Sequence, residues 1–105
     1  MSLLRRIFSA DYRAALVAEA QGNYKHAAAL YALAGATTKV SHMHLLRKNA
    51  AKTDGEEIEV LRESMRWARP RSSIQRQAAH ALAQALTRRA RAEGVSTERD
   101  RAALR

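Results

Sequence analysis

The sequence predicts an all-α fold of stacked antiparallel helix hairpins, and three observations carry this prediction. Alanine, leucine, arginine, glutamate and glutamine, all good helix formers, dominate the 105 residues. One proline and four glycines are the only strong breakers. Between these breaks, apolar residues recur three and four positions apart, as they do on one face of a helix. We therefore expect about five to six helices in a row.

Two helices joined by a tight turn are expected at the start of the chain. Ser9 is a candidate N-cap for a helix over about 10–21, and Gly22 can end that helix by taking a positive φ. Asn23 can cap a second helix over about 24–34. Because the link between them is so short, the two helices must run antiparallel.

A second pair of helices is expected to follow. The third helix fits about 37–52, where Val40 and Met43 begin an apolar stripe. Residues 53–57 contain two overlapping capping boxes, which predict a fourth helix over about 55–68 before the proline at position 70.

The third pair is expected to begin with a long helix. Ser72 is its candidate N-cap, with Gln75 as the capping-box partner, and its apolar stripe continues to about residue 92. Gly94 is expected to end it, and a sixth helix is expected over about 97–105. Since the sixth helix would expose apolar residues, either the repeat continues in a longer protein or another chain covers this surface. A homodimer through 97–105 is therefore one expectation.

Helix pairs recur about every 30 to 40 residues, which is typical of stacked helical hairpins. The first pair resembles the tetratricopeptide repeat (TPR) family in the spacing of its turn glycine and of the small and aromatic residues in its second helix: Gly22, Tyr24, Ala27, Tyr31 and Ala34. The second and third pairs keep this pattern more loosely. The resemblance implies one right-handed solenoid domain over 1–105, with hairpins at about 9–35, 37–70 and 72–105.

The resemblance also implies a function. Members of this family are non-catalytic scaffolds that bind peptides or proteins in a concave groove lined by the first helix of each hairpin. Carried over to this chain, the partner-binding residues would be Tyr12, Arg13, Leu16 and Glu19 from the first hairpin, and Met43, His44 and Arg47 from the second. One subclass clamps carboxylate tails with a lysine and an asparagine, where this chain has Tyr12 and Leu16, so that clamp is not expected.

Charge gives a second set of candidate binding residues. The formal net charge is +9, and residues 64–92 contain seven arginines and no acidic residue. Arg76, His80 and Arg88 are expected on one polar side of the long helix. An acidic protein segment is the favoured occupant of this arginine strip. Nucleic acid is an alternative, since arginines can neutralise phosphates, although the strip lacks aromatic side chains on which bases could stack.

A further alternative concerns the first eight residues. Leu3, Leu4, Ile7 and Phe8 share one helical face and could make weak contact with a membrane surface. Otherwise this segment would be a leading helical turn that covers the first hairpin. No apolar run approaches the roughly 20 residues that cross a bilayer, and no signal peptide is recognised. We expect a cytoplasmic protein, and the lack of cysteine is consistent with a reducing compartment.

Catalytic and metal sites are not expected. His42 and His44 lie two residues apart, so on a helix their side chains point about 200° from each other and cannot share one metal ion. The acidic residues in 54–63 look like a helix N-terminal turn that complements the dipole. No nucleophile elbow or phosphate-binding glycine loop is present. We therefore expect no enzymatic activity and no cofactor.

Overall fold

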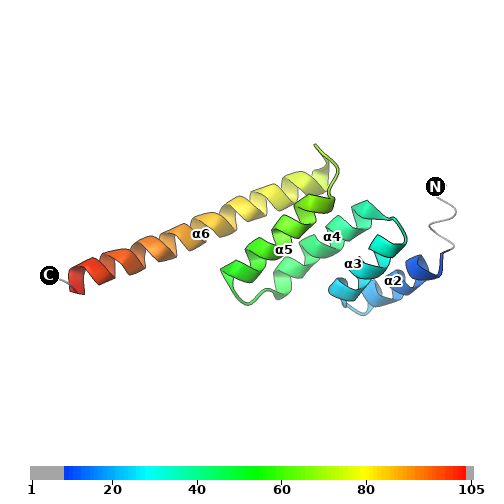
Figure 1. The fold of residues 1–105 in the computed structure, drawn as a ribbon, viewed down its shortest axis with the longest axis horizontal. Coiled ribbons are helices and arrows are strands. Elements are labelled where there is room, and N and C mark those ends of the chain that lie inside the picture. The colour runs from blue at the N-terminus through cyan, green and yellow to red at the C-terminus, as the bar shows by residue number, and fades with distance from the viewer. Residues whose placement is uncertain (1–8, 104–105) are drawn as a thin grey trace.

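The computed structural model describes residues 9–103, with side chains up to Gly94. Within this range the chain forms five α-helices and one 3-10 helix, and no strand, which confirms the all-α prediction. The elements are α2 (Ala10–Ala20), α3 (Tyr24–Leu33), α4 (Thr37–Arg47), η1 (Lys48–Ala50), α5 (Asp54–Trp67) and α6 (Ser73–Ala103) (Figure 1). The membrane contact expected of Leu3, Leu4, Ile7 and Phe8 lies outside the described residues.

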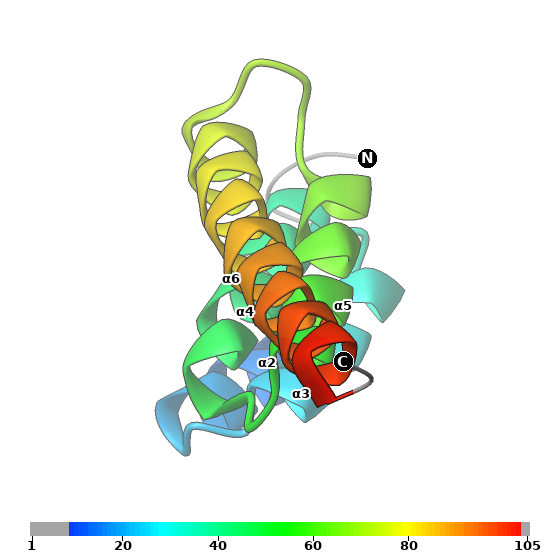
Figure 2. The ribbon, with the colours of Figure 1, turned by 90° about the vertical axis from the view of Figure 1, so that its left-hand side faces the viewer.

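Each helix packs against the next along the chain, and α6 also touches α4. The helices therefore form a row rather than a bundle closed around one centre, as Figures 1 and 2 show. The overall dimensions are 67 × 28 × 16 Å and the radius of gyration is 17.8 Å. A compact domain of this length would have a radius of gyration of about 13 Å, so the row and its projecting last helix make the molecule elongated.

The first two links are glycine turns of one kind. Gly22 and Gly35 have φ of +76° and +74°, which only glycine adopts without strain. After α2, the Gly22 N–H donates to the Glu19 carbonyl (2.9 Å) and the Asn23 N–H to the Ala18 carbonyl (2.9 Å). This pair of bonds satisfies the last carbonyls of the helix. The predicted antiparallel hairpin over α2 and α3 follows from it.

The N-caps predicted at Ser9, Thr53 and Ser72 are present, but the capping-box partners Glu56 and Gln75 each accept from the residue before the cap. The hydroxyl oxygens of Ser9, Thr53 and Ser72 each accept a hydrogen bond from the N–H three residues on, at 3.0–3.1 Å. The Gln75 side chain, however, accepts from the N–H of Arg71 (2.6 Å) rather than from the cap residue itself. This bond helps hold Arg71 at φ +63°, an uncommon value for a residue with a side chain.

Two apolar clusters hold the row together. The first joins α2, α3 and α4 around Tyr31, which is fully buried. The second joins α4, α5 and α6 around Leu61, also fully buried. Alanine supplies many of the buried positions, including Ala15, Ala27 and Ala78. Because alanine side chains are small, the helix axes can approach closely, as the sequence predicted.

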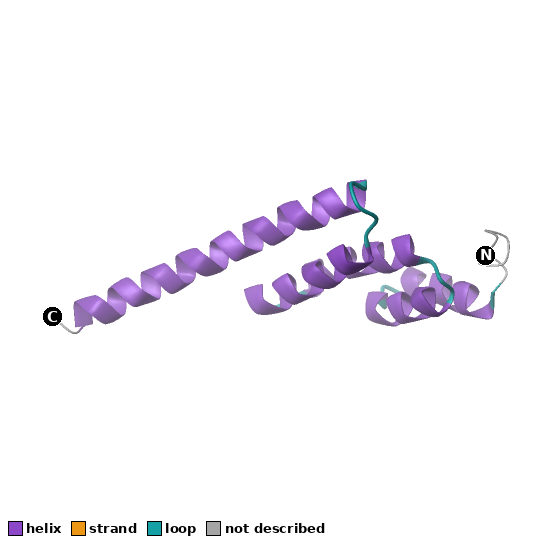
Figure 3. Ribbon diagram, turned by 45° about the horizontal axis from the view of Figure 1, so that its top comes forward, coloured by secondary structure: helices purple, strands orange, loops and turns teal. Residues whose placement is uncertain are grey.

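The prediction that the long helix ends at Gly94 is wrong. α6 is a single helix of 31 residues that runs through Gly94 to Ala103 without interruption (Figure 3). A glycine inside a helix costs only about 1 kcal/mol relative to alanine, and here helix-forming residues continue on both sides. The sixth helix expected at 97–105, and with it the third hairpin, is therefore absent from the described residues.

The second half of α6 extends beyond the rest of the row. Arg88 is the last described residue of α6 that bonds to α5, and residues 89–94 are all exposed. Figure 1 shows this part of α6 reaching away from α5 with no helix beside it. Packing on α5 therefore supports only the first half of α6.

Candidate functional site between helices α4 and α6

A groove with a volume of about 330 Å³ lies where α4 and η1 face α6. We call it the α4–α6 groove. Its lining is mixed apolar and polar and contains no carboxylate: His42, Leu45, Leu46, Lys48, Asn49, Gln77, His80, Ala81 and Gln84.

Helical spacing explains why these side chains meet. His42, Leu45 and Asn49 lie three and four residues apart along α4 and η1, so they share one side. Residues 77, 80, 81 and 84 share one side of α6 in the same way. Leu45 and Ala81 are 7% and 6% exposed and form an apolar floor, while the polar side chains stand around it.

A second hollow, of about 430 Å³, continues the groove along α6. It shares His80 and Gln84 with the α4–α6 groove and adds four residues further along the helix: Ala83, Thr87, Arg88 and Arg91. We call this part the α6 extension. It also contains no carboxylate. The two hollows together form one surface with basic and amide side chains.

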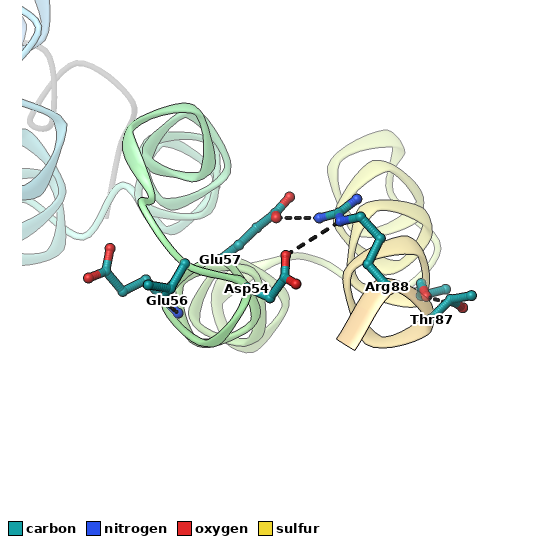
Figure 4. Close-up of polar contacts among 7 residues, drawn as sticks. Asp54, Glu56, Glu57, Thr87 and Arg88 are labelled. Atoms are coloured by element: carbon teal, nitrogen blue, oxygen red, sulfur yellow. Dashed lines mark hydrogen bonds and ion pairs between the residues drawn. The ribbon is translucent and has the colours of Figure 1, made fainter. Parts of the chain in front are cut away.

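One arginine of the α6 extension is already paired. The Arg88 guanidinium donates to Glu57 and to Asp54, with 3.4 Å between Arg88 Nε and Asp54 Oδ1. Figure 4 shows both carboxylates reaching across from α5, while Glu56 and Thr87 point away. These bonds, above all the one to Glu57, raise the pKa of Arg88. Arg88 therefore ties α6 to the start of α5 and is not a free charge of the arginine strip.

The other predicted residues of the long helix differ in their surroundings. Arg76 lies at the start of α6, where its guanidinium donates to the Arg71 carbonyl (2.9 Å). His80 lines both hollows. His80 and Arg88 thus both line the α6 extension, whereas Arg76 lines neither hollow.

The residues predicted from the second hairpin do not line this groove. Met43 is fully buried in the first core cluster, so its prediction as a groove residue is wrong. His44 and Arg47 lie on another side of α4 and bond to each other, with 3.0 Å between Arg47 NH1 and His44 Nδ1. Neighbouring residues on a helix point about 100° apart. His44 and Arg47 therefore face away from the groove that His42 lines.

The residues predicted from the first hairpin also lie elsewhere. Tyr12 packs edge-on against Tyr31, with 5.2 Å between the ring centroids, and Glu19 accepts a hydrogen bond from the Tyr31 hydroxyl (2.6 Å). Both are structural contacts. Arg13 and Leu16 are exposed on α2. None of the four reaches the α4–α6 groove.

Sequence reasoning missed most of the groove. His42, Leu45, Asn49, Gln77 and Gln84 were not singled out as binding residues. The spacing of positions 42, 45 and 49 is a signal for a shared helix side. That this side faces α6 could not be read from the spacing, because it depends on how α4 packs on α5.

A third hollow, of about 510 Å³, lies on the other side of α4. Glu56, Glu59 and Glu63 line it from one side of α5, and Arg47 and Lys25 also contribute. Part of this charge is satisfied within the chain, since Glu63 pairs with Arg66 (2.9 Å) and Glu56 accepts from the Lys52 N–H (3.0 Å). We therefore place the candidate site in the α4–α6 groove.

The half-buried His44 makes stability depend on pH. Burial, and secondarily the charge of Arg47, lower the pKa of His44 below its ordinary value of 6.5. Its Nδ1 accepts from Arg47, which only the neutral ring can do. As the pH falls below 6.5, the unfolded chain takes up this proton before the folded chain does, so acidification destabilises the fold.

We expect His44→Gln to reduce this dependence. Urea unfolding at pH 7.5 and pH 5.5 should show a smaller loss of unfolding free energy in the variant than in the parent. His26→Gln is the matched control, because His26 is exposed on α3. An unchanged pH dependence in His44→Gln would contradict the assignment.

Comparisons with protein families, curated proteins and solved structures give no match to this chain. The TPR resemblance therefore remains a prediction. Among the described residues, no group of three or more histidine, cysteine or acidic side chains could hold a metal ion. None of the described helices has the length and apolar character needed to cross a membrane.

Proposed function

We propose that this chain is a non-catalytic adaptor that binds a peptide segment of another protein in the α4–α6 groove. The observation that carries the proposal is the lining of the groove, which combines an apolar floor with a ring of amide and imidazole groups. Peptide and ligand sites have this composition, because apolar contact supplies affinity and a few polar groups fix orientation.

The polar groups of the groove are free to bond a partner. The side chains of His42, Asn49, His80 and Gln84 make no hydrogen bond to other described side chains or to the described backbone. A peptide backbone offers both N–H and C=O groups. Amide side chains can bond to either, and such bonds would replace those to water.

The wider proposal concerns the architecture and location. In a TPR-like right-handed solenoid, this groove would lie between the first helices of two neighbouring hairpins. The row of α2 to α5 supports two such hairpins, and α6 would begin a third. A cytoplasmic location and a homodimer through the end of α6 are further parts of the proposal, and neither is needed for peptide binding.

A nucleic-acid ligand is less favoured. Tyr31 belongs to the first core cluster, and Tyr12, Tyr24 and Trp67 pack against it. No phenylalanine, tyrosine or tryptophan among the described side chains lines the α4–α6 groove or the α6 extension. Single-stranded nucleic acid is usually held by stacking on such side chains.

Blocking the groove tests the proposal. Peptides selected on the parent protein from a random display library should lose at least tenfold in affinity for His80→Trp, because the larger side chain fills the groove. His26→Trp, an equal substitution on exposed α3, should bind them unchanged. Helical circular dichroism would verify that both variants fold. Selected peptides that bind His80→Trp as well as the parent would exclude this groove.

A further inference from the structure

We infer that the bound segment is extended and acidic. This rests on the proposed function, since it names the partner of the same groove. Two features carry it: the charge of the lining and the length of the surface.

All the charged side chains in the lining are basic. Lys48 on η1 and Arg88 and Arg91 on α6 line the α4–α6 groove and its extension, and no acidic side chain does. Among the described side chains, the only carboxylates bonded to this lining are those of Asp54 and Glu57, which reach Arg88 from α5. Lys48 and Arg91 have no carboxylate partner among these side chains. An acidic segment would therefore meet uncompensated positive charge in the α4–α6 groove and again in the α6 extension.

The length of the surface sets the size of the segment. Gln77 and Arg91, at the two ends of the lined part of α6, are separated by about 21 Å at a rise of 1.5 Å per residue. An extended chain covers about 3.3 Å per residue, so roughly six residues fill the surface. Leu45 and Ala81 form the apolar floor at one end. The fitting segment thus carries apolar residues over this floor and acidic residues along the rest of the surface.

A labelled peptide of roughly six residues, with leucines at one end and glutamates over the rest, tests the inference, with a twin in which glutamine replaces glutamate. Fluorescence anisotropy on the whole chain at low ionic strength should show the glutamate peptide binding at least tenfold more tightly than its twin. Circular dichroism would verify the fold. Equal affinity for the two peptides would overturn the inference.

Charge variants separate this inference from the proposed function. Lys48→Gln with Arg91→Gln should still bind the glutamine twin but lose the preference for the glutamate peptide. Arg62→Gln with Arg69→Gln makes the same change of charge at exposed positions outside the groove and should keep the preference. An unchanged preference in the first double variant would overturn the inference while leaving peptide binding intact. If the parent binds neither peptide, the groove is not a general peptide site and the proposed function fails with the inference.

Discussion

Replacing Tyr31 with alanine is expected to lower the free energy of unfolding by about 3–5 kcal/mol. Tyr31 is fully buried at the centre of the first core cluster, where α2, α3 and α4 meet. Its ring packs edge-on against Tyr12 and lies 5.6 Å from Lys39 Nζ. Alanine would leave a cavity among small neighbours that cannot fill it. Urea denaturation followed by circular dichroism measures the loss.

Two further variants separate ring packing from hydrogen bonding at this position. Tyr31→Phe keeps the ring and removes only the hydroxyl that donates to Glu19, at an expected cost of about 1 kcal/mol. Tyr24→Ala removes a ring that is only partly buried, so it should cost less than Tyr31→Ala. A loss below about 1 kcal/mol in Tyr31→Ala would show that the first cluster is not organised around this ring.

Replacing Ser64 with leucine is expected to have an effect of similar size, about 3 kcal/mol or more. Ser41 on α4 and Ser64 on α5 are fully buried, and each hydroxyl donates to the backbone carbonyl of the other residue, at 2.6 and 2.8 Å. Bonds of this kind require the two helices to lie very close. Leucine would both remove one bond and force the helices apart.

Two further variants, Ser64→Ala and Ser73→Leu, make this prediction specific. Ser64→Ala removes the hydroxyl without adding volume, so a loss of about 1–2 kcal/mol is expected. Ser73→Leu places the same large side chain at an exposed position of α6 and should change stability by less than about 0.5 kcal/mol. Thermal unfolding ranks the three variants. Ser64→Leu as stable as the parent would mean that α4 and α5 do not approach as described.

The serine pair also bears on the candidate site. It fixes the rotation and distance of α4 against α5, while Arg88 fixes α6 against the start of α5. The α4–α6 groove lies between the two helices that these contacts position. Loosening either contact should therefore weaken peptide binding, because it would change how α4 and α6 are placed relative to each other.

Local features of this protein could be predicted from its sequence, because the interactions that produce them span only a few residues. The caps at Ser9, Thr53 and Ser72 and the positive φ of Gly22 and Gly35 are of this kind. They determine where most helices begin and end, and hence the antiparallel order of α2 to α5. At Gly94 the local signal was ambiguous, since glycine can end a helix or be tolerated within one.

Only the tertiary structure decided which sides of the helices face one another. Ser41 and Ser64 are 23 residues apart, and Asp54 and Arg88 are 34 apart, so no local pattern pairs them. The side of α4 that faces α6 depends on these distant contacts, which place His42 rather than Met43 in the groove. A change of one residue turns a helix by about 100°, and the packing of α4 on α5 is what selects among these orientations.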